Sequence, residues 1–122
     1  MSEFKGTPGP WVASDHYYDV TTVIDGNGLQ VVKAERCAVL QGWDEKGFKH
    51  WADSEEAHRW LSADEQTANA KLIAAAPELL EACLRIQAQL RQAGITSVAG
   101  SLNPAQDSAA QIDSAILKAL GE

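Results

Sequence analysis

The feature that most constrains the fold is an alanine-rich stretch, residues 68–82, which reads ANAKLIAAAPELLEA. Alanine favours the helix and carries little bulk, so another element can approach such a helix closely. Pro77 interrupts the stretch, because proline lacks a backbone donor and clashes with the preceding turn. Ser62 and Glu65 fit a capping box upstream. We therefore expect a helix that opens at Ser62 and ends or kinks at Pro77. Its expected buried side carries Leu72, Ile73, Ala75 and Ala76.

Two amphipathic helices are predicted after this point. From Pro77, apolar residues recur at intervals of four, three and four, which draws one stripe along a helix that stops near Gly94. Asn103 and Pro104 fit the cap and first position of another helix, which ends at Gly121. We expect the two helices to pair antiparallel. Their stripes are Leu79, Cys83, Ile86 and Leu90, and Ile112, Ile116, Ala119 and Leu120.

The first half of the chain favours strands. Residues 17–24 and 29–34 are rich in β-branched residues and flank Asp-Gly-Asn-Gly at 25–28, which predicts a hairpin. Short strands are also expected at 11–14 and 37–41. Further expectations are a loop or an irregular strand pair at 43–53 and a short helix at 54–60.

The order of these segments predicts an α+β fold, with an N-terminal antiparallel β-sheet followed by a C-terminal helical hairpin. The 122 residues fit a single domain over 1–122, strand-rich at about 7–53 and helical at about 54–121.

The charge balance bears on the partners. Seventeen acidic and ten basic residues give a net charge of −7, which opposes binding to nucleic-acid polymers and to anionic membranes. No apolar run approaches the ~20 residues of a membrane span. We expect a cytoplasmic protein.

Motifs for catalysis and metal binding are not found in the sequence. It has no phosphate-binding glycine loop, no GxSxG, no HExxH and no calcium loop. The three histidines have no partner at helical spacing, and neighbouring acids fit solvated faces. We therefore expect no catalytic residue, no metal and no cofactor, and we do not expect an enzyme.

A ligand site is a more specific hypothesis. Guanidinium and ammonium groups bind phosphates and indoles stack on bases, so the basic and aromatic residues of the middle segment suit a small anionic nucleotide. The alternative is that the tryptophans pack in the core or an interface and the charges are solvated. Asn69 either contacts a ligand or caps a turn. The residues in question are Lys33, Arg36, Lys46, Lys49 and Arg59, with Trp43, His50, Trp51, His58 and Trp60.

Two motifs carry a resemblance. TPGPW at residues 7–11, followed by a strand-rich middle and the 68–82 stretch, resembles a group of small accessory proteins of tailed phages and prophages, including Ead-like ones. The layout of a sheet followed by two helices is similar to the anti-Thoeris phage sponge proteins. Those are non-enzymatic oligomers that sequester cyclic ADP-ribose isomers or cyclic oligonucleotides.

The resemblance implies a phage anti-defence protein in the host bacterial cytoplasm that binds a cyclic nucleotide signal without cleaving it. It also implies a homo-oligomer, which we expect to assemble through the C-terminal helices. Trp11 and Asn69 match the motifs, whereas Arg59, Arg85 and Arg36 are chosen on their chemistry as ligand-binding candidates. We expect the tryptophans and cations of the first half to meet the alanine-rich helix in a pocket. The alternative is an inhibitor that binds a defence complex, such as an anti-CRISPR or another host-takeover factor.

Overall fold

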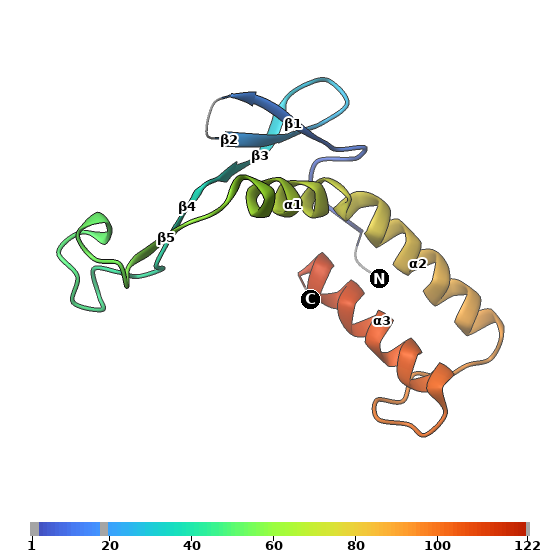
Figure 1. Cartoon of the computed structure of the whole chain (residues 1–122). Coiled ribbons are helices and arrows are strands. Elements are labelled where there is room, and N and C mark those ends of the chain that lie inside the picture. The colour runs from blue at the N-terminus through green and yellow to red at the C-terminus, as the bar shows by residue number, and fades with distance from the viewer. Residues whose placement is uncertain (1–2, 18–19, 122) are drawn as a thin grey trace. The chain divides into compact units, whose positions relative to one another are not determined.

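The chain forms two compact units, each with its own secondary structure (Figure 1). The computed structural model describes residues 3–17 and 20–121. One unit is Pro10–Ala75, and the other combines the N-terminal segment through Gly9 with the chain from Ala76 onward. Strands precede helices along the chain, which confirms the α+β class. The expectation of one domain stays a prediction.

The larger sheet has three antiparallel strands in the order β1-β2-β3, which are β1 (Val12–Tyr17), β2 (Val20–Ile24) and β3 (Gln30–Glu35). The hairpin between β2 and β3 is confirmed. Tyr17 ends β1, paired with Val20, and does not open the second strand as the β-rich run suggested. Residues 18–19 of that run lie outside the described residues.

A separate ribbon follows, in which β4 (Cys37–Val39) pairs antiparallel with β5 (His58–Trp60). The connection contains turns and a short 3₁₀ helix, Trp51–Asp53, so the loop reading of 43–53 is the correct one. The helix expected at 54–60 is wrong. Residues 54–57 form a turn, in which the Ser54 hydroxyl accepts the Glu56 amide and the Ser54 carbonyl accepts the Ala57 amide. Residues 58–60 form β5, whose backbone groups pair with β4 and not within a helix.

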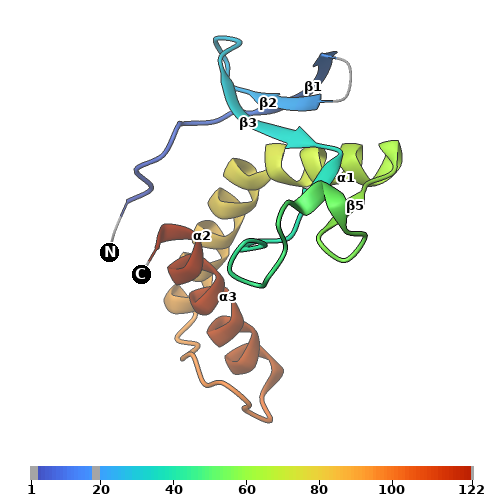
Figure 2. The ribbon, with the colours of Figure 1, turned by 90° about the vertical axis from the view of Figure 1, so that its left-hand side faces the viewer.

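Helix α1 (Ala63–Ala74) begins after Ser62, whose side chain accepts the Glu65 amide as predicted. The sheet of β1, β2 and β3 packs against this helix (Figure 2). Gln66, Ala70 and Ala74 lie one helical turn apart and face the sheet, where Val23 is fully buried. Gln66 also donates to the Ala34 carbonyl at 2.8 Å.

The expected buried side of α1 was partly wrong. Ile73 packs at the edge of the core, whereas Leu72 is 66% exposed and Ala76 is also exposed. Leu72 follows Ala70 by two residues, which turns it roughly 200° around the helix axis. The sheet approaches the small side chains, and the bulky leucine is left in solvent.

Two antiparallel helices form most of the second unit, α2 (Ala76–Gln92) and α3 (Pro104–Leu120), as expected (Figure 1). Helix α1 ends at Ala74 and α2 starts at Ala76, so Pro77 marks a break and lies in the first turn of a new helix. Asn103 caps α3 by accepting the Ala105 amide, and Gly121 ends it in the left-handed conformation.

Apolar side chains are only partly covered in this helix pair. Ile116 and Ala109 are buried, but Leu79 remains 50% exposed. Between α2 and α3 lies an apolar hollow of about 240 Å³, which we call the α2–α3 hollow. Its lining includes Leu79, Leu80, Cys83, Ala115 and Ala119. Over the described ranges, no helix is long and apolar enough to cross a bilayer.

Candidate functional site

The two sequence motifs meet on α1. Trp11 of the first motif is half-buried and packs against the cluster formed by Val23, Ala70 and Ala74. Asn69 of the second motif precedes Ala70 and points to solvent. The side-chain amide of Asn69 has no hydrogen-bond partner within residues 3–17 and 20–121. Trp11 therefore packs on the buried side of α1, and Asn69 lies on the exposed side of the same helix.

Arg59 reaches the same exposed face. Its guanidinium donates to both carboxylate oxygens of Glu65, at 2.9 and 3.0 Å. Glu65 is four residues before Asn69, so the two side chains share one face of the helix. The hydrogen bonds from Arg59 hold the pKa of the Glu65 carboxyl below its ordinary value. We call Arg59, Glu65 and Asn69 the α1 face.

The salt bridge replaces part of the predicted capping box. Glu65 was expected to reach back to the Ser62 amide, and it is instead held by Arg59 from β5. The pair is solvent-exposed and therefore exchanges readily with other charged groups. A phosphate that approaches Arg59 competes with the Glu65 carboxylate for the same two donors.

Arg36 supports the start of α1. It sits between β3 and β4, and its Nε donates to the Leu61 carbonyl at 3.2 Å, while its own carbonyl accepts the Leu61 amide at 2.6 Å. These bonds tie the chain together one residue before the Ser62 cap. Four of the five candidate residues, Trp11, Arg36, Arg59 and Asn69, thus belong to the unit Pro10–Ala75.

Arg85 lies in the other unit. It is on the exposed side of α2 and pairs with Glu81 at 3.3 Å, a spacing of four residues. Exposed pairs of this kind contribute little to stability.

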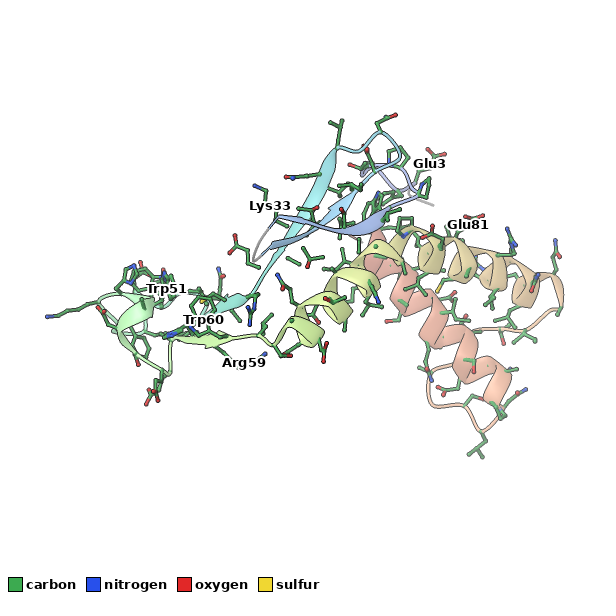
Figure 3. The ribbon with its side chains drawn as sticks, turned by 45° about the horizontal axis from the view of Figure 1, so that its top comes forward. Glu3, Lys33, Trp51, Arg59, Trp60 and Glu81 are labelled. Carbon is green, nitrogen blue, oxygen red and sulfur yellow. The ribbon has the colours of Figure 1, made fainter. Side chains whose placement is uncertain are left out.

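The remaining tryptophans do not meet α1, which corrects the sequence-based expectation. Trp43, Trp51 and Trp60 lie on the β4–β5 ribbon and its connection, residues 36–61, which we call the arm; Figure 3 labels Trp51 and Trp60 there. These tryptophans precede α1 closely in the sequence, which suggested that they would cluster with it. The β4–β5 pairing separates them, because it carries residues 40–57 into a connection of their own.

Four rings of the arm form a continuous series. The centroids are 5.4 Å apart for Trp43 and His50, 5.3 Å for His50 and Trp51, and 5.6 Å for Trp51 and His58. We call these residues the ring row. His58 Nδ1 lies 3.0 Å from the Trp51 carbonyl and 2.8 Å from the Ser54 carbonyl, so this nitrogen carries the proton. His50 Nδ1 accepts the Ala52 amide and caps the 3₁₀ helix.

Sequence reasoning assigned the neighbouring acids of the arm to solvated faces and did not weigh them against the lysines of the cluster. The connection 41–57 carries five exposed acidic residues against Lys46 and Lys49. Counting both signs in the same window would have shown that this segment is acidic. The acidic residues are Asp44, Glu45, Asp53, Glu55 and Glu56.

A family comparison connects the chain to phages. A family model described as Salmonella phage P22 protein Y8K6 matches residues 1–122. The chain belongs to this family. Membership supports the phage origin that the two motifs indicated. No curated protein and no solved structure matches the chain.

The described part of this family member offers no group of three or more His, Cys, Asp or Glu side chains that could hold a metal ion. The α1 face presents a guanidinium, a carboxylate and an amide, which are groups for hydrogen bonding and charge pairing.

Proposed function

We propose that this phage protein binds a small anionic nucleotide and holds it without cleaving it. The ligand class is a cyclic ADP-ribose isomer or a cyclic oligonucleotide, of the kind that bacterial defence systems use as a signal in the host cytoplasm. The observation that carries the proposal is that both motifs contribute to the unit built on α1: Trp11 packs against the buried cluster that includes Ala70, while Asn69 and Arg59 lie on the exposed face of the same helix.

Each group has a role in this proposal. Arg59 turns from Glu65 to a phosphate, because a guanidinium binds both partners through the same paired donors. Asn69 offers an amide donor and an acceptor to a base edge or a ribose hydroxyl. Arg36 keeps the start of α1 in place. Sequestration requires stoichiometric binding only, so the proposal includes no catalytic residue and no cofactor.

The proposal includes a homo-oligomer assembled through the C-terminal helices. The α2–α3 hollow and the exposed Leu79 leave apolar surface that a second helix pair would cover. In such an assembly the proposal places Arg85, on the exposed side of α2, in a ligand site.

Thermal melting in the presence of candidate nucleotides tests the binding. The panel contains cyclic ADP-ribose isomers and cyclic di- and trinucleotides. A ligand at 100 times its dissociation constant stabilises the fold by about 2.7 kcal/mol and raises the midpoint by several degrees. The Asn69→Ala variant should melt as the wild type does without ligand, and it should lose most of the ligand-induced shift.

The Gln89→Ala variant is the matched control, because it also removes an exposed helical amide, in this case from α2. It should retain the full shift. An unchanged midpoint across the whole panel would contradict nucleotide binding. Ligand released by heating the complex should be intact, and recovery of cleaved nucleotide would contradict sequestration.

A second candidate function is inhibition of a bacterial defence complex by direct protein binding. The observation that favours it is the uncovered apolar ribbon of the arm, where Trp60 is 64% exposed. Affinity purification from infected cells should then recover a stoichiometric protein partner, and a Trp60→Ser bait should lose that partner. Recovery with both baits in equal amounts would argue against this function.

A further inference from the structure

The β4–β5 ribbon has one apolar face that the described residues leave open. Cys37 pairs with Trp60 and Val39 with His58, so these four side chains share a face, while Ala38 and Arg59 occupy the other. Val39 is 42% exposed and Trp60 is 64% exposed. Two strands of three residues each are marginally stable without a covering layer. This face therefore has the properties of an interaction surface.

The ring row extends this face beyond the strands. It continues from His58 through Trp51 and His50 to Trp43, with neighbouring centroids less than 6 Å apart. The bond from His58 Nδ1–H to two carbonyls holds the first ring against the connection. The result is a fixed series of aromatic rings beside an exposed indole, and aromatic faces of this kind attract guanidinium and ammonium groups.

Exposed carboxylates belong to the same connection as the rings. The five acids of residues 41–57 are exposed, and with two lysines they give this segment a net charge of −3. Lys46 donates to the Gln41 carbonyl and so is held at the start of the same segment. The charge and the rings together fit a cationic partner and oppose a phosphate group.

We infer that the arm docks a basic protein segment, in which arginine or lysine side chains stack on the ring row and Trp60 and pair with the exposed carboxylates of residues 41–57. A guanidinium suits both contacts, because its flat face stacks on an indole while its edge donates to a carboxylate. This inference specifies a surface and a partner chemistry for direct protein binding. It does not require the nucleotide site on α1.

Two other occupants fit less well. A nucleotide brings phosphates to a segment that already carries excess negative charge. A second copy of the chain carries a net charge of −7, so acids would face acids unless the arms met through their apolar side chains alone. A basic segment is the occupant whose charge complements residues 41–57; Arg36 and Arg59 bring the arm as a whole to a net charge of −1.

Isothermal titration of the full-length protein tests the inference. The probe is a short peptide of alternating arginine and alanine, and its counterpart replaces each arginine by glutamate. The arginine peptide should bind and the glutamate peptide should not. Binding should weaken as salt is added, because the carboxylates of the arm supply part of the attraction.

Variants locate the binding surface. Trp60→Ser should lower the affinity for the arginine peptide about tenfold, as expected when an exposed aromatic anchor is removed. Leu29→Ser is the matched control, since Leu29 is equally exposed and belongs to the β2–β3 turn, not to the arm. It should leave the affinity unchanged. Glu55→Gln combined with Glu56→Gln should weaken binding at low salt and have little effect at high salt.

Several results would overturn the inference. The inference is wrong if the arginine peptide does not bind, or if the glutamate peptide binds with the same affinity. It is also wrong if Trp60→Ser and Leu29→Ser lower the affinity for the arginine peptide equally. A change of mass on Trp60→Ser in light scattering would assign the face to a second copy. The nucleotide melts are independent of these outcomes, because Trp60→Ser leaves Asn69 in place.

Discussion

At the scale of single residues, Asp113 holds the helix pair together. The buried Gln87 of α2 donates to Asp113 Oδ1 at 2.7 Å, and the Ser97 hydroxyl of the connecting loop donates to Oδ2. Arg91 lies 4.0 Å from the same carboxylate. The hydrogen bonds from Gln87 and Ser97 lower the pKa of the Asp113 carboxyl. One side chain thereby links α2, the loop and α3.

This arrangement predicts a pH-dependent stability. Because the folded pKa of Asp113 lies below the unfolded one, the ionised carboxylate stabilises the fold above about pH 4. That stabilisation is lost as the pH falls through the folded pKa. Asp113→Asn should lower the free energy of unfolding by about 1 kcal/mol at pH 7, since one acceptor of the pair is replaced by a donor.

Urea unfolding at a series of pH values measures this difference. The difference between the wild type and Asp113→Asn should shrink as the pH falls below about 4, because the carboxylate is protonated first in the unfolded chain and then, at a lower pH, in the folded protein. A difference that stays constant over this range would show that the ionised form has no special role.

At the scale of elements, the β2–β3 hairpin depends on its turn. Asp25 Oδ1 accepts the Asn27 amide at 2.8 Å and the Leu29 amide at 3.0 Å, which closes the turn from one side chain. Gly28 has a φ of 81°, in the left-handed region. The space around a Cβ at Gly28 and at Gly26 is open, so only backbone conformation distinguishes the two positions.

We therefore predict opposite outcomes for two glycine substitutions. Gly28→Ala should lower the free energy of unfolding by about 1 kcal/mol, because a side chain there disfavours the left-handed conformation. Gly26→Ala should be neutral or slightly stabilising, since its backbone lies outside that region and alanine restricts the unfolded chain. Thermal melts of both variants measure the effect. Equal losses would indicate that contacts, and not backbone strain, govern the turn.

At the scale of the whole molecule, the exposed area is large for the mass. The chain has a mass of 13.1 kDa and exposes 8809 Å². Two separate compact domains of half that mass would together expose about 7,700 Å². The surplus of roughly 1,100 Å² exceeds the ~800 Å² that each partner buries in a standard interface. An oligomer of the proposed kind would cover part of this surface.

Light scattering of the purified protein should then give a multiple of 13.1 kDa. Leu79→Glu should reduce the mass to that of one chain, because it places a charge at the half-exposed wall of the α2–α3 hollow. Leu29→Glu introduces the same charge at an exposed leucine of the β2–β3 turn and should leave the mass unchanged. A monomeric wild type would contradict assembly through the C-terminal helices.

Local patterns in the sequence determined most of the elements. Ser62, Asn103 and Gly121 carry their helix-end signals within a few residues of themselves, and Asp25 carries the turn signal in the same way, so each is readable without a structure. The motif pair likewise indicated phage origin, which family membership supports. Nucleotide binding and oligomerisation remain proposals.

Tertiary structure decided what depends on contacts between distant residues. A strand, β5, formed in place of the expected helix because it pairs with β4 about twenty residues earlier. Glu65 pairs with Arg59 on that strand and does not complete the capping box. The sheet packed on Ala70 and left Leu72 in solvent, although leucine is the more apolar side chain. A local pattern records propensity and spacing along the chain. It does not record which surface covers a side chain, and the tertiary contacts placed Trp11 against the buried side of α1 and the other three tryptophans on the arm.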